Sequence, residues 1–278
     1  MFDMNFILPR LHKTPALNSL SRCAASFIAA LLLLAATCTA ADLSPEPTSA
    51  KAGKIPDKLV VMTFDDSVAD HATYVAPQLK KFGFGATFFI TEGFNFLTNK
   101  TRYLTWEQIK ELNDAGFEIG NHTRNHQSVQ TQSPDQIAAD VAHIEQQCAA
   151  HCIPRPTSFC YPGYATSPAA VQVLRSRGYR FARAGGRQAF DPVKDDPLLM
   201  PQAFDSKPDC KFEQFVAAVA QARSGHIAVM TFHGVPDLEH PWVDTAPAKF
   251  EKYLEYLKEQ GCTVVSVRDM AKYLPPPK

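Results

Sequence analysis

The sequence predicts a single α/β domain, in which parallel strands form a closed or nearly closed barrel surrounded by helices. Three observations favour this fold class. Short apolar runs alternate with helical stretches seven or eight times, which is typical of parallel strands joined by crossover helices. The ordered part of the chain, about 220 residues, suits a β/α barrel better than an open doubly wound sheet. No shift in composition divides it into two domains.

Eight segments rich in apolar, β-branched or aromatic residues are expected to be strands. In chain order they cover residues 59–64, 86–90, 117–120, 158–161, 181–184, 198–204, 227–232 and 263–267.

Six segments between these runs are expected to be helices, and their boundaries carry capping residues. Thr105, followed by Gln108, resembles a capping box. Ser133 and Ser167 each precede a proline, which suits the first helical position. The expected helices cover residues 70–82, 105–115, 134–149, 168–177, 211–223 and 248–260.

The composition is that of an ordinary globular protein. Of 278 residues, 45% are hydrophobic and 20% are charged. Lys and Arg together number 28, as do Asp and Glu, so nothing indicates the basic surface by which a protein binds nucleic acid. The composition carries no signal of an oligomeric state.

Residues 1–40 have the pattern of an export signal. Three basic residues precede or flank an apolar run at 27–36, and Cys38-Thr39-Ala40 offers a small-x-small cleavage site. An uncleaved membrane anchor and a lipid attachment at Cys38 are alternatives, but the run is short for a bilayer span. We therefore expect a periplasmic or secreted protein without stable membrane insertion after cleavage. It would comprise a linker at 41–57 and one domain at 58–278.

Five cysteines remain after the expected cleavage, too few for a disulfide scaffold. An odd number outside the cytosol implies at least one thiol or an intermolecular bridge. Cys148 and Cys152 are the pair we expect to form a bridge, because they lie close together in sequence. They do not complete a zinc site, because His151 alone does not supply the two further ligands required.

Polar residues capable of chemistry collect at the ends of four expected strands. In parallel β/α folds these ends meet at one edge of the sheet, where functional residues gather. An adjacent carboxylate pair and three histidines fall at equivalent positions in this way. The four segments are 63–67, 120–126, 159–164 and 231–234.

The spacing of His122 and His126 lets two imidazoles bind one metal ion. A carboxylate from another strand would complete a set of three ligands and leave room for water, as in catalytic sites. Asp65 and Asp66 could divide the work, one binding metal and one acting as base. Because neighbours on a strand point to opposite faces, the chain must bend at Ser67 for both to reach the ion.

On these residues the chain resembles the polysaccharide deacetylase family, the carbohydrate esterase family 4-like proteins with a NodB-homology domain. The resemblance spans residues 58–274. The family's T-F-D-D motif matches residues 63–66, its H-[ST]-x-x-H motif matches 122–126, and a late strand ending in histidine matches 227–233.

The resemblance implies a distorted (β/α)7-8 barrel and one divalent metal ion, commonly Zn²⁺, with Co²⁺, Ni²⁺ or Mn²⁺ as alternatives. Asp66, His122 and His126 would hold the ion. Asp65 would act as general base, and His233 as the general acid that protonates the leaving amine or alcohol.

The third motif departs from the main family pattern. Residues 159–164 resemble an F-x-Y-P-x-G branch, with Cys160 or Tyr161 near the position where the family commonly has an arginine that braces the catalytic aspartate. Tyr161, Gly163 and Tyr164 are therefore candidates for binding the oxyanion or the substrate, with the Gly163 N–H as expected donor. The tryptophan of a fourth motif is not evident, and Asp205 is a candidate to orient His233.

The expected function is an exported metal-dependent hydrolase that removes N-acetyl, or O-acetyl, groups from a carbohydrate substrate. One alternative is hydrolysis of a cyclic or small linear amide on the same scaffold. Another is a carbohydrate-binding protein without turnover. The remaining histidines, which include His71 and His240, are expected to have no role in the site.

Overall fold

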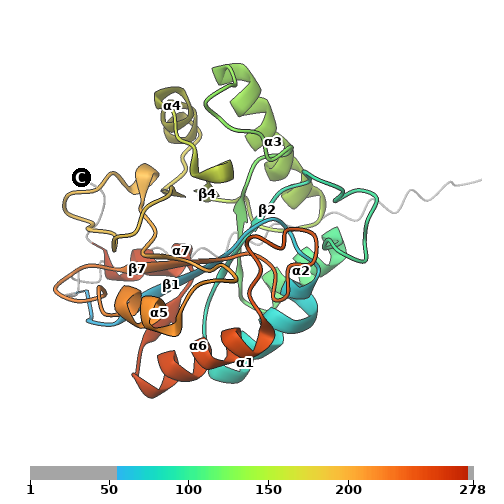
Figure 1. Ribbon diagram of the computed structural model, residues 1–278. Helices are drawn as coiled ribbons and strands as arrows, with labels where there is room; N and C mark the ends of the chain where they lie inside the picture. Colours follow the sequence, from blue (N-terminus) through green and yellow to red (C-terminus); the bar gives the residue numbers. More distant parts are fainter. Residues whose placement is uncertain (1–54, 275–278) are drawn as a thin grey trace, which may run out of the picture. The chain divides into compact units, whose positions relative to one another are not determined.

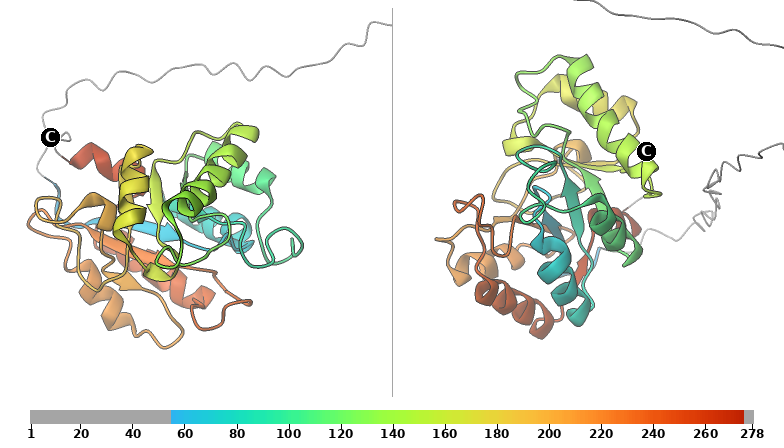
Figure 2. Two further views of the ribbon diagram at one scale, coloured as in Figure 1. Left: turned by 90° about the horizontal axis from the view of Figure 1, so that it is seen from above. Right: turned by 90° about the vertical axis from the view of Figure 1, so that its right-hand side faces the viewer.

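A computed structural model describes residues 55–274, in which eight parallel strands form one curled sheet with helices outside it (Figures 1 and 2). The strand order is β5-β4-β3-β2-β1-β7-β6. β8 lies off this path and pairs with the first half of β1, whereas β2 pairs with the end of β1. The strands are β1 (Leu59–Phe64), β2 (Thr87–Ile90), β3 (Glu118–Asn121), β4 (Ser158–Cys160), β5 (Phe181–Arg183), β6 (Phe204–Asp205), β7 (Ala228–Phe232) and β8 (Thr263–Val265).

The predicted barrel is confirmed in a distorted form. β5 and β6 are the two ends of the hydrogen-bonded sheet, so the barrel is open between them. The chain that joins them narrows this gap, because Met200 forms a parallel bridge with Arg183. The predicted strand at 198–204 is largely wrong. Residues Pro197–Leu199 form a 3₁₀ turn, and Pro197 and Pro201 lack the N–H that a strand ladder requires, so regular pairing is limited to β6.

The helices agree with the sequence analysis except near the C-terminal end of the domain. A π-helical turn (His71–Val75) leads into α1, and the capping boxes at Thr105 and Ser133 are formed. The predicted helix at 211–223 ends early, and a short helix after β8 was not expected. The helices are α1 (Ala76–Phe82), α2 (Trp106–Asp114), α3 (Pro134–Ala150), α4 (Pro168–Ser176), α5 (Phe212–Val219), α6 (Pro247–Glu259) and α7 (Val267–Met270).

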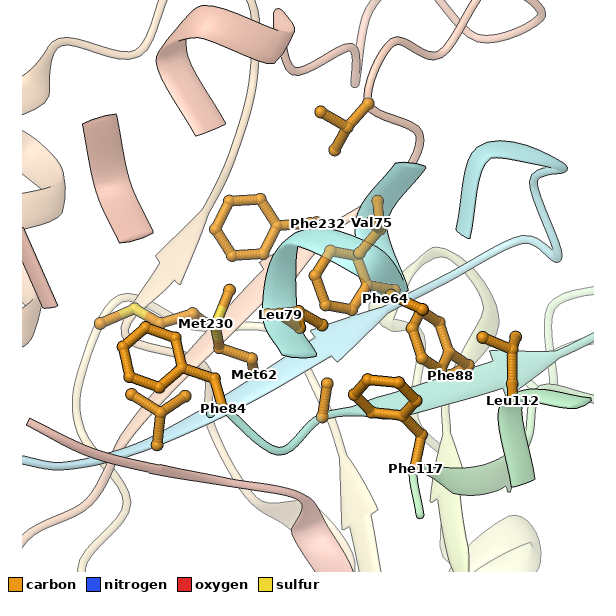
Figure 3. Close-up of a cluster of buried hydrophobic side chains, with 14 of the residues drawn as sticks. Met62, Phe64, Val75, Leu79, Phe84, Phe88, Leu112, Phe117, Met230 and Phe232 are labelled. Atoms are coloured by element: carbon orange, nitrogen blue, oxygen red, sulfur yellow. The ribbon is translucent and has the colours of Figure 1, made fainter. Parts of the chain in front are cut away.

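Strand β1 is buried on both faces, and this sets the direction of the residues that follow it. Val60, Met62 and Phe64 pack outward in the main core, where Phe64 stacks between Phe88 and Phe232 (Figure 3). Leu59 and Val61 belong to a second cluster with Phe89 and Cys160, so they face the barrel interior. By the same alternation, Asp65 continues the interior row.

Some expectations fall outside these elements. Residues 1–54, with the predicted export signal and nearly all of the linker, lie outside the described residues. Between residues 55 and 274, no helix has the length and apolar character needed to cross a membrane. The expected pairing of Cys148 with Cys152 is wrong, because Cys148 is a free thiol, and it is buried against the core.

Candidate metal centre and active site

The chain bends sharply where β1 ends, and this brings two adjacent carboxylates to one cavity. Asp66 and Ser67 have φ values of 71° and 57°, in the left-handed region. Ser67 is held there by the end of β2, because its Oγ donates to the carbonyl of Thr91 (2.8 Å) and accepts from the N–H of Thr91 (2.9 Å). Asp65 and Asp66 therefore both line one cavity of about 290 Å³, as the predicted bend requires.

The end of β3 positions two imidazoles in the same cavity. Thr123 and His126 also adopt positive φ, 63° and 53°. The Asn121 side chain accepts from the N–H of Thr123 (2.9 Å), and the Thr123 hydroxyl accepts from the N–H of His126 (3.1 Å). These bonds wind the chain so that His122 and His126 approach each other, with ring centroids 4.8 Å apart.

A glycine makes room for this turn. A Cβ added at Gly93 would lie only 2.8 Å from the Cβ of His126, closer than real Cβ atoms approach. The loop that follows β2 can therefore pass beside the second histidine only because residue 93 has no side chain.

Asp66, His122 and His126 form a group of donors that fits a divalent cation. Oδ1 of Asp66 lies 3.4 Å from Nε2 of His122 and 3.3 Å from Nε2 of His126. Ligands about 2.0–2.1 Å from a tetrahedral zinc ion are separated by about 3.3–3.4 Å. Oδ1 is buried and has no hydrogen-bond partner in the described structure, as expected for an atom whose partner is a metal.

The orientation of His122 supports the same role. Its Nδ1 lies 2.8 Å from the carbonyl oxygen of Cys160. A carbonyl only accepts, so Nδ1 carries the proton and Nε2 presents its lone pair toward Asp66. One carboxylate and two imidazoles leave a cation open to water, which is the arrangement of catalytic zinc sites.

Asp65 is paired with Arg183, a partner that the sequence analysis missed. Arg183 is fully buried, and its Nη2 donates to Oδ2 of Asp65 and to the sulfur of Cys160, while Nη1 donates to Gln202 (2.7 Å). Burial by itself would raise the pKa of Asp65, but the Arg183 charge reverses this, so the pKa lies below its usual value. The group stays ionised, and its Oδ1 has no hydrogen-bond partner in the described structure.

An arginine therefore does brace the aspartate, but it comes from β5 rather than from the third motif on β4. The sequence did contain a signal for this pair, because Arg183 lies inside the apolar run Phe181–Ala184. A charged side chain in a buried strand requires a buried partner.

His233 follows β7 and completes the group. Its Nε2 lies 3.9 Å from Oδ2 of Asp65 and 3.9 Å from Oδ2 of Asp66. His71, expected to have no role, lies within hydrogen-bond distance of the carbonyl oxygen of His233 (Nε2 to O, 3.0 Å) and so fixes the backbone there.

Asp205 does not orient His233 in this structure. Its carboxylate pairs with Lys207 (3.3 Å), and Nδ1 of His233 is buried with no hydrogen-bond partner among residues 55–274. The register between β6 and β7 is the reason that the prediction fails, because Asp205 lies opposite Thr231, two residues before His233.

Of the three candidate residues from the third motif, only two lie at the cavity. Tyr161 is fully buried, donates its hydroxyl to the carbonyl of Leu198 (2.8 Å) and its N–H to Arg183, so it does not face substrate. Strand alternation is the reason, since Cys160 takes the interior position and Tyr161 the opposite one. Gly163 and Tyr164 do line the cavity.

Two long loops supply further residues that sequence reasoning did not place at the site. The Phe94 ring lies 4.6 Å from His126 and 4.5 Å from His240, between centroids, and Trp242 lies at the rim with 66% of its surface exposed. His240 is oriented by Asp237, 3.3 Å from its Nδ1. No strand or helix pattern connects these residues to the site, so no sequence signal could have placed them there.

Comparison with known proteins agrees with this geometry. Residues 52–182 match the family model described as polysaccharide deacetylase. A peptidoglycan-N-acetylglucosamine deacetylase of Bacillus cereus is 26% identical over 232 residues, covering 82% of this chain and 96% of that protein. YxkH of Bacillus subtilis is 26% identical over 157 residues, 53% of this chain, and the match spans only 55% of its length.

The fold agrees as well. The Xyl-CE4 domain of a multidomain xylanase from the hindgut metagenome of Trinervitermes trinervoides superposes with a TM-score of 0.57 at 21% identity, covering 80% of this chain and 94% of that one. The match to the polysaccharide deacetylase family thus covers residues 52–182 of this chain, and the structural comparison shows a shared fold.

Proposed function

We propose that this protein is an exported, metal-dependent hydrolase that removes acetyl groups, N-linked or O-linked, from a carbohydrate. One observation carries the proposal. A single cavity holds a set of metal ligands together with an ionised aspartate, one oxygen of which has no hydrogen-bond partner among the described residues, and a histidine 3.9 Å from it.

Asp66, His122 and His126 would hold the metal ion, and zinc fits the donor set best, with cobalt, nickel or manganese as alternatives. When bound, such an ion polarises a carbonyl and lowers the pKa of water.

Asp65 is the general base in this proposal. Arg183 occupies its Oδ2, keeps it charged and restricts its rotation, while Oδ1 is left to accept a proton from the attacking water. As the water oxygen bonds to the acetyl carbon, negative charge develops on the acetyl oxygen. The Gly163 N–H, at the cavity wall, is our proposed donor to that oxygen.

His233 is the general acid. Once the tetrahedral intermediate has formed, the C–N or C–O bond breaks and the leaving nitrogen or oxygen requires a proton. His233 lies across from both aspartates and can supply it. A protein that only binds carbohydrate needs neither this acid nor an ionised base, which favours turnover over the binding alternative.

Acetate release tests the proposal across chitooligosaccharides, peptidoglycan, poly-N-acetylglucosamine and acetylxylan. We expect release from at least one of them, loss of activity with a chelator, and recovery with zinc or cobalt. Hydrolysis of a small cyclic amide with no acetate release would favour the amide alternative, and binding without any hydrolysis would favour the carbohydrate-binding protein.

Export is a separate part of the proposal. N-terminal sequencing of the protein recovered outside the cytoplasm should begin at Ala41. Recovery of the intact N-terminus in a membrane fraction would favour an uncleaved anchor.

A further inference from the structure

The two histidines of the metal centre are oriented in different ways. His122 is buried, and its Nδ1 donates to the carbonyl of Cys160 (2.8 Å), which fixes the ring. The side chain of His126 is 22% exposed, and apart from Asp66 its ring has no hydrogen-bonding partner among residues 55–274. A histidine that binds metal usually donates its other nitrogen to a carbonyl or a carboxylate, so the orientation of His126 has another cause.

The ring of Phe94 contacts this imidazole. The two centroids are 4.6 Å apart, and the planes are inclined by 38°. The same phenyl ring contacts His240 (4.5 Å) and stacks on Tyr103 (6.3 Å, planes 9° apart). Tyr103 is buried, and Asp237 orients His240, so Phe94 connects the exposed His126 to two rings that are themselves fixed. Rings at these separations attract each other beyond the effect of their buried area.

The backbone of Phe94 is strained in this position. Its φ is 57°, in the left-handed region, which is rare for a bulky residue. The ring is 46% exposed, so burial in a core does not compensate for the strain. Strain of this kind persists where the surrounding structure imposes it, and it is concentrated at functional sites.

The loop that carries Phe94 is joined directly to the segment that carries His126. The N–H of Glu92 and the hydroxyl of Thr91 both donate to the carbonyl of Arg124 (3.0 Å and 3.2 Å). These bonds, with the close passage of Gly93 beside His126, hold the two rings at a fixed separation. Their contact is therefore built into the backbone and is not a chance meeting of two surface side chains.

We propose that Phe94 is a positioning residue for the metal centre. Its ring holds the imidazole of His126 in the orientation that brings Nε2 to 3.3 Å from Oδ1 of Asp66. Stacking thus does for His126 what a hydrogen bond does for His122. His126 is the ligand that turns away when the ion is released, and Phe94 sets how long the ion is retained. The inference rests on the proposed function, which supplies the ion, and adds a residue that determines its retention.

The rate of zinc release tests the inference without any substrate. The zinc-loaded protein is mixed with an excess of pyridylazoresorcinol, a zinc-binding dye, and the absorbance of the dye complex is followed. Phe94→Leu keeps an apolar side chain and the same backbone strain but removes the ring, and release should become about tenfold or more faster. Phe94→Tyr keeps the ring, and its release rate should stay within about threefold of wild type.

Two controls separate the ring from the loop and from the fold. Leu97→Ala changes a side chain of the same loop that is 66% exposed, and it should release zinc at the wild-type rate. Thermal unfolding of the metal-free proteins should give the same midpoint for Phe94→Leu and Phe94→Tyr, because both side chains lie half in solvent.

Wild-type release from Phe94→Leu would overturn the inference. Equal acceleration in Phe94→Leu and Phe94→Tyr would also overturn it, since the ring would then not be the cause, and so would equal acceleration in Leu97→Ala. The proposed function stands in all three cases. A wild-type protein that binds no zinc would contradict the metal centre of the proposed function, and the inference would fall with it.

Discussion

Buried carboxylates occur at both ends of the sheet, and their surroundings differ. At the amino end, Glu118 opens β3 and has every oxygen satisfied. Oε1 accepts from Ser158 (2.6 Å), and Oε2 accepts from Thr87 (2.7 Å) and from the N–H of Arg268 (2.6 Å). At the carboxyl end, Asp65 and Asp66 each keep one buried oxygen that has no hydrogen-bond partner in the described part of the chain.

The pKa values of Glu118 and of the two aspartates also shift in opposite directions. Burial raises the pKa of Glu118 despite its three donors. In spite of burial, the Arg183 charge lowers the pKa of Asp65, and the surrounding histidines lower the pKa of Asp66. Saturated hydrogen bonding identifies Glu118 as a structural group that joins three strands and α7. Unsatisfied, ionised oxygens identify the aspartates as groups arranged for a ligand.

The largest expected effect is on turnover. Asp65→Asn removes the base but keeps an acceptor for Arg183, so turnover should fall by about two to four orders of magnitude while bound metal is retained. Steady-state kinetics and elemental analysis would measure the two quantities. Glu118→Gln, a matched change at the other end, should leave kcat within about twofold of wild type. Normal activity of Asp65→Asn would remove the base assignment.

Arg183→Met should lower kcat by about 10–100-fold, because Asp65 loses the group that orients it and keeps it charged. Arg183→Lys retains the charge and should recover part of the loss. Rates are referred to the folded fraction, measured by circular dichroism, since an unpaired buried aspartate also costs stability. Equal rates in all three proteins would show that the pair has no part in catalysis.

Glu118→Ala should have the opposite signature, a loss of stability without a specific loss of activity. Two hydroxyls and one N–H lose their acceptor in the interior, at a cost of about 2–4 kcal/mol in the free energy of unfolding. Urea denaturation measures this cost. A change below about 0.5 kcal/mol would contradict the structural role assigned to Glu118.

The smallest effect concerns Asp70, which lies behind the site and accepts from the N–H of Val235 (2.7 Å). Burial, reinforced by the charges of Asp237 and Asp244, raises its pKa from 3.8 to about 8. The folded state thus holds a proton that the unfolded chain releases near pH 4, and stability is lost as the pH rises from about 4 to 8. Asn cannot ionise.

Asp70→Asn should therefore match wild type below about pH 3.5 and exceed its unfolding free energy by about 1–2 kcal/mol near pH 5, since each pH unit between the two pKa values contributes about 1.4 kcal/mol. The measurement is urea unfolding at several pH values. A constant difference between the two proteins would mean that Asp70 does not titrate in this range.

Much of the catalytic end could be predicted because the residues follow strands directly. Asp65, His122 and His233 each stand at the first or second position after a strand, and parallel strands bring such positions to one edge. Local capping rules predicted the helix starts at Thr105 and Ser133 for a similar reason, since donor and acceptor lie within one turn.

The rest depends on packing between segments distant in sequence. The pairing of Arg183 with Asp65 spans β5 and β1, and nothing local to either strand specifies it. Phe94 and His240 come from loops whose path is set by tertiary contacts. Tyr161 was misplaced because a shift of one position along a strand reverses the face that a side chain occupies. Asp205 was misplaced because the pairing of β6 with β7 sets it opposite Thr231, two residues before His233.

Metal binding by the folded protein tests the central claim most directly. Elemental analysis after dialysis against zinc should give one divalent ion per chain for the wild type, and His126→Ala should lose most of it, while His143→Ala, on α3 outside the group, keeps it. A wild-type protein that binds no ion, or a His126→Ala variant with unchanged metal content, would contradict the account.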